Sequence, residues 1–449
     1  MSRGEERERY VFLETFGCQM NANDSERILG QLATMNYRAT NDPEGADLIL
    51  LNTCSIREKA EHKVYSALGR YRGVKRKKPH TIIGVGGCVG QQQGERLLKR
   101  LDYLDIVFGT ATIHRLPELI QSVDRDRGQR EATELATALA PDEFAITPFR
   151  DSPYKAFITI MRGCDNFCSY CIVPYVRGRE ASRSAGSIVD EVEGLAASGV
   201  REITLIGQNV NSYGNDGGGT SFPALVKTVC GVDGIERVRF TTSHPKDLSV
   251  ELIDLIAGEE KICNHLHLPV QSGSDAVLKK MGRGYTRTEY LHKVSLLKEL
   301  SPEISLTTDI IVGFPGEGDN DFNDTVKLLN EVEFDNFFSF KYSPRPMTKA
   351  ASFAEQVDED VKSARLQTVQ KLQSGITLAK NKRLAGESLD VLVEGKAKTG
   401  DALLTGRTSC NRVVNFPGAE EWSGETVQVT IQEGFLNSLK GVVKGVNRC

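Results

Sequence analysis

Apolar runs alternate with amphipathic segments along the first quarter of the chain. The short apolar runs predict four strands, at residues 11–15, 48–51, 81–85 and 105–108. Apolar residues with helical spacing predict four helices between and after these strands, at residues 25–35, 56–71, 95–101 and 117–123. Strands that alternate with helices form parallel sheets, because parallel neighbours need a long crossover connection. We therefore expect an N-terminal open parallel α/β sheet in a domain of residues 8–125.

A longer alternation follows a charged, alanine-rich stretch at residues 124–153, which we interpret as a linker. It predicts six further strands, at residues 156–161, 202–206, 237–241, 265–268, 304–312 and 336–342. Helical patterns lie between them, for example at residues 187–197, 249–256, 288–300 and 321–332. Six strand–helix units are fewer than the eight of a closed barrel, so we expect a partial (βα)6 barrel over residues 150–384.

The pattern shortens once more after a long polar helical stretch from Asp358 to about Leu384. Five alternating runs predict short strands, at residues 389–393, 403–407, 413–416, 426–431 and 439–443. Short strands at this spacing are typical of a small β-barrel, expected here over residues 385–449. Five basic residues of this region could form a phosphate-contacting face or a mixed solvated surface: Lys396, Lys398, Arg407, Arg412 and Lys440.

Composition changes this picture little. A length of 449 residues suits about three domains. The net charge of −4 argues against a basic coat that binds nucleic acid indiscriminately, so any RNA contact must come from local patches. The first residues are charged and lack an apolar signal segment, and no apolar run approaches the length of a membrane span. We expect a cytoplasmic protein that does not contact a membrane.

Three of the ten cysteines stand in one short loop after a predicted strand. Cys164, Cys168 and Cys171, which we call the loop cysteines, have the spacing CxxxCxxC. Thiolates in so tight a loop can share one soft metal centre, either zinc or an iron–sulfur cluster. Structural zinc needs four ligands, and no fourth Cys or His follows within several dozen residues. A cluster with one open iron is therefore favoured over zinc and over three unrelated core cysteines.

Cys18, Cys54 and Cys88, which we call the N-terminal cysteines, each follow a predicted strand of the first domain. The carboxyl ends of parallel strands meet at one edge of a sheet, so residues far apart in sequence converge there. The neighbouring Gly17 and Gly87 suit the tight turns that such a crowded edge requires. The sequence therefore predicts a second three-cysteine site.

The segment Arg162–Arg179 resembles the methylthiotransferase family of radical S-adenosylmethionine enzymes. Thr15–Asn21 and Asn52–Ser55 resemble the N-terminal domain of that family, and the resemblance extends over nearly the whole chain. It implies S-adenosylmethionine and two 4Fe-4S clusters as cofactors, with radical initiation at the loop cysteines and sulfur donation at the N-terminal cysteines. It also implies a C-terminal, OB-like TRAM domain that binds RNA, and an electron donor such as flavodoxin or ferredoxin. Met347 departs from the family pattern, in which we expect Gly at this position.

Polar and glycine-rich loops follow the later predicted strands, where barrels of this kind carry their active residues. The alternative is that these loops are simple turns. Resemblance to radical S-adenosylmethionine barrels makes four of their residues candidates for contacts to the cofactor: Gln208, Ser243, Gln271 and Asp309.

The resemblance leaves three substrates open, namely a tRNA adenosine with an isopentenyl group, a tRNA adenosine with a threonylcarbamoyl group, and an aspartate of a ribosomal protein. Gly207–Gly214 resembles the isopentenyl-adenosine version, and Asn209 and Asn211 within it could read base edges or form a turn. We expect a monomeric enzyme that methylthiolates carbon 2 of N6-dimethylallyladenosine at tRNA position 37, just 3′ of the anticodon. A non-catalytic iron–sulfur or zinc module that binds RNA is the alternative from another class.

Overall fold

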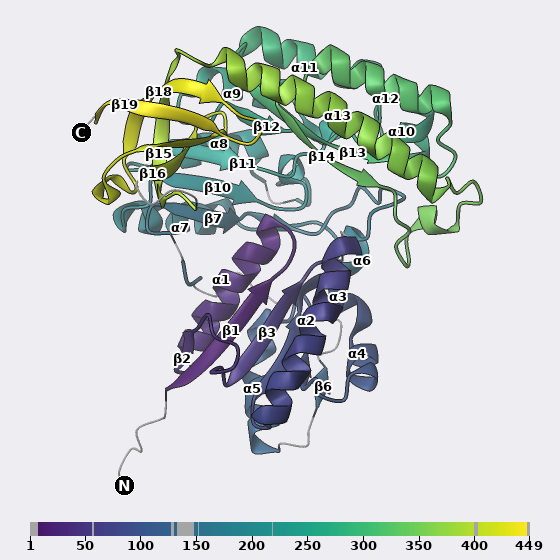
Figure 1. The fold of residues 1–449 in the computed structure, drawn as a ribbon, viewed down its shortest axis with the longest axis vertical. Coiled ribbons are helices and arrows are strands. Elements are labelled where there is room, and N and C mark those ends of the chain that lie inside the picture. Colours follow the sequence, from purple (N-terminus) through teal and green to yellow (C-terminus); the bar gives the residue numbers. More distant parts are fainter. Residues whose placement is uncertain are drawn as a thin grey trace.

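The computed structural model describes residues 8–55, 58–126, 130–132, 148–150, 152–217, 219–398 and 403–446. The N-terminal sheet lies below a large curved α/β body in Figure 1, and a small barrel, drawn in yellow, packs against the side of that body. Among the described residues, none of the helices combines the length and the apolar character that crossing a membrane requires.

The N-terminal sheet has the strand order β2-β1-β3-β4-β5-β6, and all neighbouring strands are parallel. Its strands are β1 (Arg9–Thr15), β2 (Tyr37–Ala39), β3 (Leu48–Thr53), β4 (Ile82–Gly86), β5 (Ile106–Val107) and β6 (Glu131–Ala132). Its helices are α1 (Gln19–Ala33), α2 (Glu58–Lys77), α3 (Gly87–Gln93), α4 (Glu95–Arg100) and α5 (Leu116–Arg125). The predicted open parallel sheet is confirmed. Every residue of β3 is buried, as expected for a strand inside a parallel sheet.

Three short elements of this domain escaped the sequence pattern: β2, α3 and β6. The two strands have three and two residues, too few to show alternation. Helix α1 also begins at Gln19, well before the predicted start at Ser25. Cys18 has extended backbone angles and is the N-cap of α1, so the helix starts as soon as the cysteine loop ends.

Six parallel strands form the partial barrel, and this prediction is confirmed. They are β7 (Lys155–Thr159), β10 (Glu202–Ile206), β11 (Arg237–Phe240), β12 (His265–His267), β13 (Ser305–Val312) and β14 (Asn336–Lys341). The surrounding helices are α7 (Ala185–Ala197), α8 (Phe222–Cys230), α9 (Val250–Gly258), α10 (Asp275–Met281), α11 (Arg287–Leu300) and α12 (Asp319–Val332). The strands form two three-stranded parallel sheets, of order β11-β10-β7 and β12-β13-β14. An isolated parallel β-bridge between Val238 and Ile262 leads from the first sheet toward the second.

The predicted first barrel strand, residues 156–161, is two strands. β7 ends at Thr159, and Met161–Arg162 forms β8, which pairs antiparallel with β9 (Ala181–Ser182). This hairpin closes the base of the loop that holds the loop cysteines and the short helix α6 (Val173–Arg177). The loop therefore has a fixed entry and a fixed exit.

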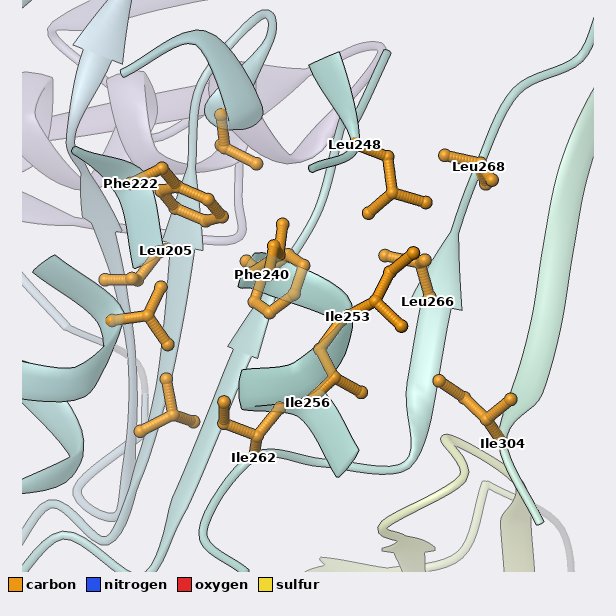
Figure 2. Close-up of a cluster of buried hydrophobic side chains, with 14 of the residues drawn as sticks. Leu205, Phe222, Phe240, Leu248, Ile253, Ile256, Ile262, Leu266, Leu268 and Ile304 are labelled. Carbon is orange, nitrogen blue, oxygen red and sulfur yellow. The ribbon is translucent and has the colours of Figure 1, made fainter. Parts of the chain in front are cut away.

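The core of the partial barrel lies between its strands and helices (Figure 2). Leu205, Phe240 and Leu266 face it from strands, while Phe222 and Ile253 face it from helices. All five are almost completely buried, and each buried side chain of this size stabilises the fold by about 1.5–3 kcal/mol. This packing fixes the strands whose carboxyl ends carry the predicted site.

Helix α13 (Glu359–Arg383) leads into a closed barrel of order β15-β16-β17-β19-β18, which confirms the predicted small β-barrel. Its strands are β15 (Ser388–Lys396), β16 (Leu403–Thr408), β17 (Val413–Pro417), β18 (Thr426–Gly434) and β19 (Leu439–Val446).

The small barrel docks on the amino ends of the partial-barrel strands. Arg237, the first residue of β11, donates to the carbonyl oxygen of Arg407 at 2.9 Å, and Lys155, the first residue of β7, pairs with Glu394 at 2.6 Å. This contact uses part of the basic face that the sequence suggested, because the backbone of Arg407 accepts from Arg237 and Arg412 pairs with Asp335 of the partial barrel. The Arg407 side chain pairs with Glu394 within the small barrel. Lys398 and Lys440 are exposed.

Candidate functional site

The N-terminal cysteines occupy the ends of three neighbouring strands. The sheet order reverses direction between β1 and β3, and ligands of such sheets bind at the carboxyl ends beside this switch point. Cys18 follows β1, Cys54 follows β3, and Cys88 is the second residue of α3, directly after β4. The structure therefore places these three cysteines at one edge of the sheet.

Two glycines allow the cysteine loops to lie close together. Gly17 has φ of +118°, and a Cβ atom there would lie 2.3 Å from the Cβ atom of Cys54. Gly87 has φ of +83°, and a Cβ atom there would lie 2.4 Å from the carbonyl oxygen of Thr53. Any L-residue at either position would meet both a strained backbone and a steric clash.

A buried ladder of hydrogen bonds ties the same loops. The side-chain amide nitrogen of Asn21 donates to the backbone carbonyl oxygens of Phe16 at 2.9 Å and of Thr53 at 2.8 Å. The Thr53 hydroxyl donates to the carbonyl oxygen of Gly86 at 2.5 Å. Burial raises the pKa of the Cys88 thiol. Metal binding at Cys88 would therefore release a proton.

The loop cysteines lie at the mouth of the partial barrel, where Cys168 is buried and Cys164 and Cys171 are partly exposed. Burial raises the pKa of Cys164 to about 11 and that of Cys171 to about 12. Among the described residues, no three side chains of Cys, His, Asp or Glu lie close enough to bind one metal ion. Three thiols on one loop are a donor set that suits an iron–sulfur cluster held by three cysteines.

Two nitrogen donors point at the sulfur of Cys168, from Arg283 and from His244, and no motif of the sequence pointed to Arg283. The Nη1 atom of Arg283 lies 3.4 Å from this sulfur, and the Nε2 atom of His244 lies 3.9 Å from it. The Nδ1 atom of His244 accepts from the backbone nitrogen of Lys246, so Nε2 carries the hydrogen. Burial lowers the pKa of His244 to about 2, which keeps the ring neutral. Hydrogen bonds donated to the sulfur of a cysteine ligand raise the reduction potential of an iron–sulfur cluster.

A cavity of about 840 Å³ opens at the carboxyl ends of the partial-barrel strands. All three loop cysteines line it, together with all four residues predicted to contact the cofactor: Gln208, Ser243, Gln271 and Asp309. Thr15, Phe16, Gly17 and Lys63 of the N-terminal domain complete its wall. Gly17 directly precedes Cys18, so the cavity reaches the edge of the second cysteine site.

Several features of the cavity suit a polar cofactor. The Ser243 hydroxyl and the Gln208 amide nitrogen are buried and have no hydrogen-bond partner among the described residues. Buried polar atoms of proteins are normally paired, so both are available to a bound ligand. The Gln208 amide oxygen accepts from the backbone nitrogen of Gly163 at 2.6 Å, which fixes the side chain against the cysteine loop.

The backbone is strained at two places in the cavity wall. Thr242 has φ of +72° and Gln271 has φ of +74°, a region that residues other than glycine rarely adopt. Such strain persists only where the surroundings enforce it, and it is frequent at functional sites. Met347, which departs from the family pattern, also has a positive φ of 71°, the conformation for which glycine is best suited.

Asn209 and Asn211 differ in their surroundings. Asn209 donates to Asp247 at 2.7 Å and accepts from the backbone nitrogen of His244 at 3.1 Å, so its amide holds the loop. Both polar atoms of the Asn211 side chain are buried without a hydrogen-bond partner among the described residues. The sequence allowed Asn209 either to read base edges or to form a turn, and these contacts favour the turn-forming role.

Comparison with known families divides the chain into three parts. Residues 10–109 match uncharacterized protein family UPF0004, residues 158–329 match the radical SAM superfamily, and residues 382–444 match the TRAM domain. A radical S-adenosylmethionine methyltransferase, TsrM, from Kitasatospora setae has the same fold with a TM-score of 0.56 at 15% identity, over 87% of this chain and 79% of that one.

Curated relatives match over almost the full length. The tRNA-2-methylthio-N(6)-dimethylallyladenosine synthase of Geotalea uraniireducens is 52% identical over 97% of this chain and 99% of its own. The protein of the same name from Geobacter sulfurreducens is 50% identical over 97% of each chain. The chain is therefore an enzyme that belongs to the family of the tRNA-2-methylthio-N(6)-dimethylallyladenosine synthases.

Proposed function

We propose that this enzyme replaces the hydrogen on carbon 2 of N6-dimethylallyladenosine in tRNA, at position 37, by a methylthio group. The full-length similarity to synthases of that name supports the substrate. The observation that carries the chemistry is the cavity whose walls come from both cysteine-bearing domains. Such a cavity lets hydrogen abstraction and sulfur delivery act on one bound base.

The radical SAM superfamily implies S-adenosylmethionine and a 4Fe-4S cluster, and we assign this cluster to the loop cysteines. We further propose a second 4Fe-4S cluster at the N-terminal cysteines. When bound, the first cluster and S-adenosylmethionine supply the radical that removes the hydrogen, and the second cluster supplies the sulfur. Three cysteines per cluster leave one iron of each open to a ligand.

The chain's own residues would bind and orient these groups. The unpaired Ser243 hydroxyl and Gln208 amide nitrogen are placed to hydrogen-bond the cofactor, and Gln271 and Asp309 line the same cavity. Phe340, Leu366 and Ile311 give part of the wall an apolar character. That part could receive the dimethylallyl group, which would explain a requirement for the prior modification.

The TRAM barrel supports a tRNA substrate, and its position constrains how tRNA binds. The barrel docks at the amino ends of the strands, whereas the cavity opens at their carboxyl ends. An RNA that touches both must therefore run along the side of the partial barrel. A single-stranded anticodon loop is a suitable target, because its bases can be splayed into a pocket.

Other parts of the proposal carry over expectations from the sequence. We propose a monomeric, cytoplasmic enzyme that takes electrons from a donor such as flavodoxin or ferredoxin. We also propose the domain boundaries 8–125, 150–384 and 385–449. β6 (Glu131–Ala132) lies beyond the first of these boundaries but pairs with β5, so the N-terminal sheet reaches residue 132.

The test uses the full chain, reconstituted with iron and sulfide without oxygen. It is incubated with S-adenosylmethionine, a reductant and three substrates in parallel, namely tRNA with dimethylallyladenosine, tRNA with threonylcarbamoyladenosine, and ribosomal protein. Mass analysis should find the methylthio product only from the first. Product only from one of the others would overturn the substrate but not the radical chemistry, while absence of 5′-deoxyadenosine would overturn both.

A further inference from the structure

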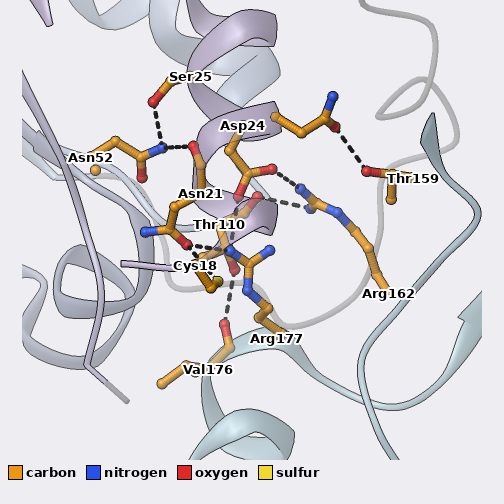
Figure 3. Close-up of polar contacts among 12 residues, drawn as sticks. Cys18, Asn21, Asp24, Ser25, Asn52, Thr110, Thr159, Arg162, Val176 and Arg177 are labelled. Carbon is orange, nitrogen blue, oxygen red and sulfur yellow. Dashed lines mark hydrogen bonds and ion pairs between the residues drawn. The ribbon is translucent and has the colours of Figure 1, made fainter. Parts of the chain in front are cut away.

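A buried network of ions, in which cations outnumber anions, links α1 of the N-terminal domain to the Arg162–Arg177 segment that carries the loop cysteines. Figure 3 shows Asp24, Arg162 and Arg177 of this network. Asp24 of α1 accepts from Arg162 at 2.8 Å and from Arg177 at 2.8 Å. Arg27 lies 3.9 Å from the same carboxylate. The side chains of these four residues are 4% exposed or less. One carboxylate thus faces three guanidinium groups, and a buried excess of charge is costly unless another group of opposite sign is present.

Arg177 is the member of this network nearest to the N-terminal cysteines. It ends α6, only six positions after Cys171, and donates to the side chain of Asn21, the residue that ties the Cys18 loop. Figure 3 shows its guanidinium group between Asp24 and Cys18. Ile172, the N-cap of α6, and Val176 within the helix also pack on Cys88, with which they form a small apolar cluster.

The guanidinium group of Arg177 faces the N-terminal cysteines. It lies beside Cys18 in Figure 3, and Cys88 packs against the helix that ends at Arg177. One nitrogen of the guanidinium group, Nη1, is buried and has no hydrogen-bond partner among the described residues. An anionic group bound by Cys18 and Cys88 would supply both the missing charge and the missing acceptor.

We propose that Arg177 is a positioning residue of the second cluster, a buried cation that the radical SAM domain inserts beside Cys18 and Cys88. The inference rests on the proposed second cluster. The site would then be built by two domains: one gives the three thiolates, and the other gives the positive charge that offsets them. A cation beside a cluster stabilises its reduced form, so Arg177 should raise the cluster's reduction potential.

The experiment uses the full chain with all three loop cysteines changed to Ala, so that only the second cluster can form. Arg177→Met and Arg177→Lys are made in this background, with Arg179→Met as the matched control. Arg179 lies two positions further on and pairs at the surface with Asp165, with 73% of its side chain exposed. Iron per chain and the midpoint potential from a redox titration followed by electron paramagnetic resonance are measured.

Arg177→Met should lower the electron affinity of the cluster at least tenfold, which is about 59 mV for a one-electron couple. Arg177→Lys should recover most of this shift, and Arg179→Met should not change the potential. Loss of iron from Arg177→Met but not from Arg177→Lys would also support the proposal, since Lys keeps the charge. An unchanged potential in the Met variant, or equal effects of Met and Lys, would overturn it. If the background protein binds no iron, the second cluster itself is wrong, whatever Arg177 does.

Discussion

Asp24→Asn should open the interface between the first two domains. The substitution keeps the size of the side chain but removes the only carboxylate that Arg162 and Arg177 both contact at 2.8 Å in the described structure. The Asp24 side chain is 1% exposed, so water cannot replace the lost partner. Removing one partner of a buried ion pair costs about 3–5 kcal/mol. Two hydrogen bonds to charged groups, at about 1.5–3 kcal/mol each, sum to about 3–6 kcal/mol, which overlaps this range.

Native-state hydrogen exchange measures this cost directly. A loss of about 4 kcal/mol raises the population of the open form about a thousandfold, because 1.4 kcal/mol corresponds to a factor of about ten. Amides of α1 and of the Arg162–Arg177 segment should therefore exchange faster in Asp24→Asn, while those of the C-terminal barrel should not change.

The matched control is Asp165→Asn, which breaks the exposed pair with Arg179 at 3.0 Å. Pairs of that kind contribute about 0–1 kcal/mol. If Asp24→Asn cost no more than Asp165→Asn, the buried network would not hold the domains together.

Four further outcomes are expected. The pKa of Asp24 is lowered, because Arg177 and Arg162 outweigh the opposing effect of burial. The stabilisation that ionised Asp24 provides is therefore complete above the unfolded pKa of about 3.9 and is lost as pH falls through the folded pKa. The difference in free energy of unfolding between the parent and Asp24→Asn should therefore shrink in acid. Changing all three loop cysteines to Ala should abolish 5′-deoxyadenosine formation but leave iron at the other site; formation at the parent rate would refute the assignment. Gly17→Ala should lose the second cluster, by iron analysis of the loop-cysteine variant, since its Cβ atom would lie 2.3 Å from that of Cys54; full iron occupancy would contradict this. Ser243→Ala should raise the concentration of S-adenosylmethionine needed for half-maximal cleavage about 2–10-fold, the value of one hydrogen bond, and an unchanged value would remove Ser243 from the cofactor site.

The sequence by itself determined the chemistry-bearing residue types and the order of the elements. The spacing of Cys164, Cys168 and Cys171 is local, so one loop must hold all three whatever surrounds it. The six barrel strands and the five strands of the C-terminal barrel follow from apolar periodicity, which reports burial directly. The position of Cys18, Cys54 and Cys88 at one sheet edge follows from a general rule about parallel strands.

Other features were visible only in part. Asn209 was open to two readings in the sequence, and only its contacts with Asp247 and His244 favour one of them. The basic residues of the small barrel resembled an RNA-binding face, yet Arg412 pairs with Asp335 of the partial barrel. A cation's partner can lie anywhere in the chain, so a charge pattern does not show whether the charge is free.

The tertiary structure alone decided how the two cysteine sites meet. Asp24 is 138 residues from Arg162 and 153 residues from Arg177, and no spacing rule links positions so far apart. The cavity wall likewise combines Gly17 of the N-terminal domain with Gln208 and Asp309 of the partial barrel. Periodicity specifies which face of an element is buried, whereas contacts between domains depend on how whole surfaces fit together. That fit places a cation of the radical SAM domain beside the cysteines of its neighbour.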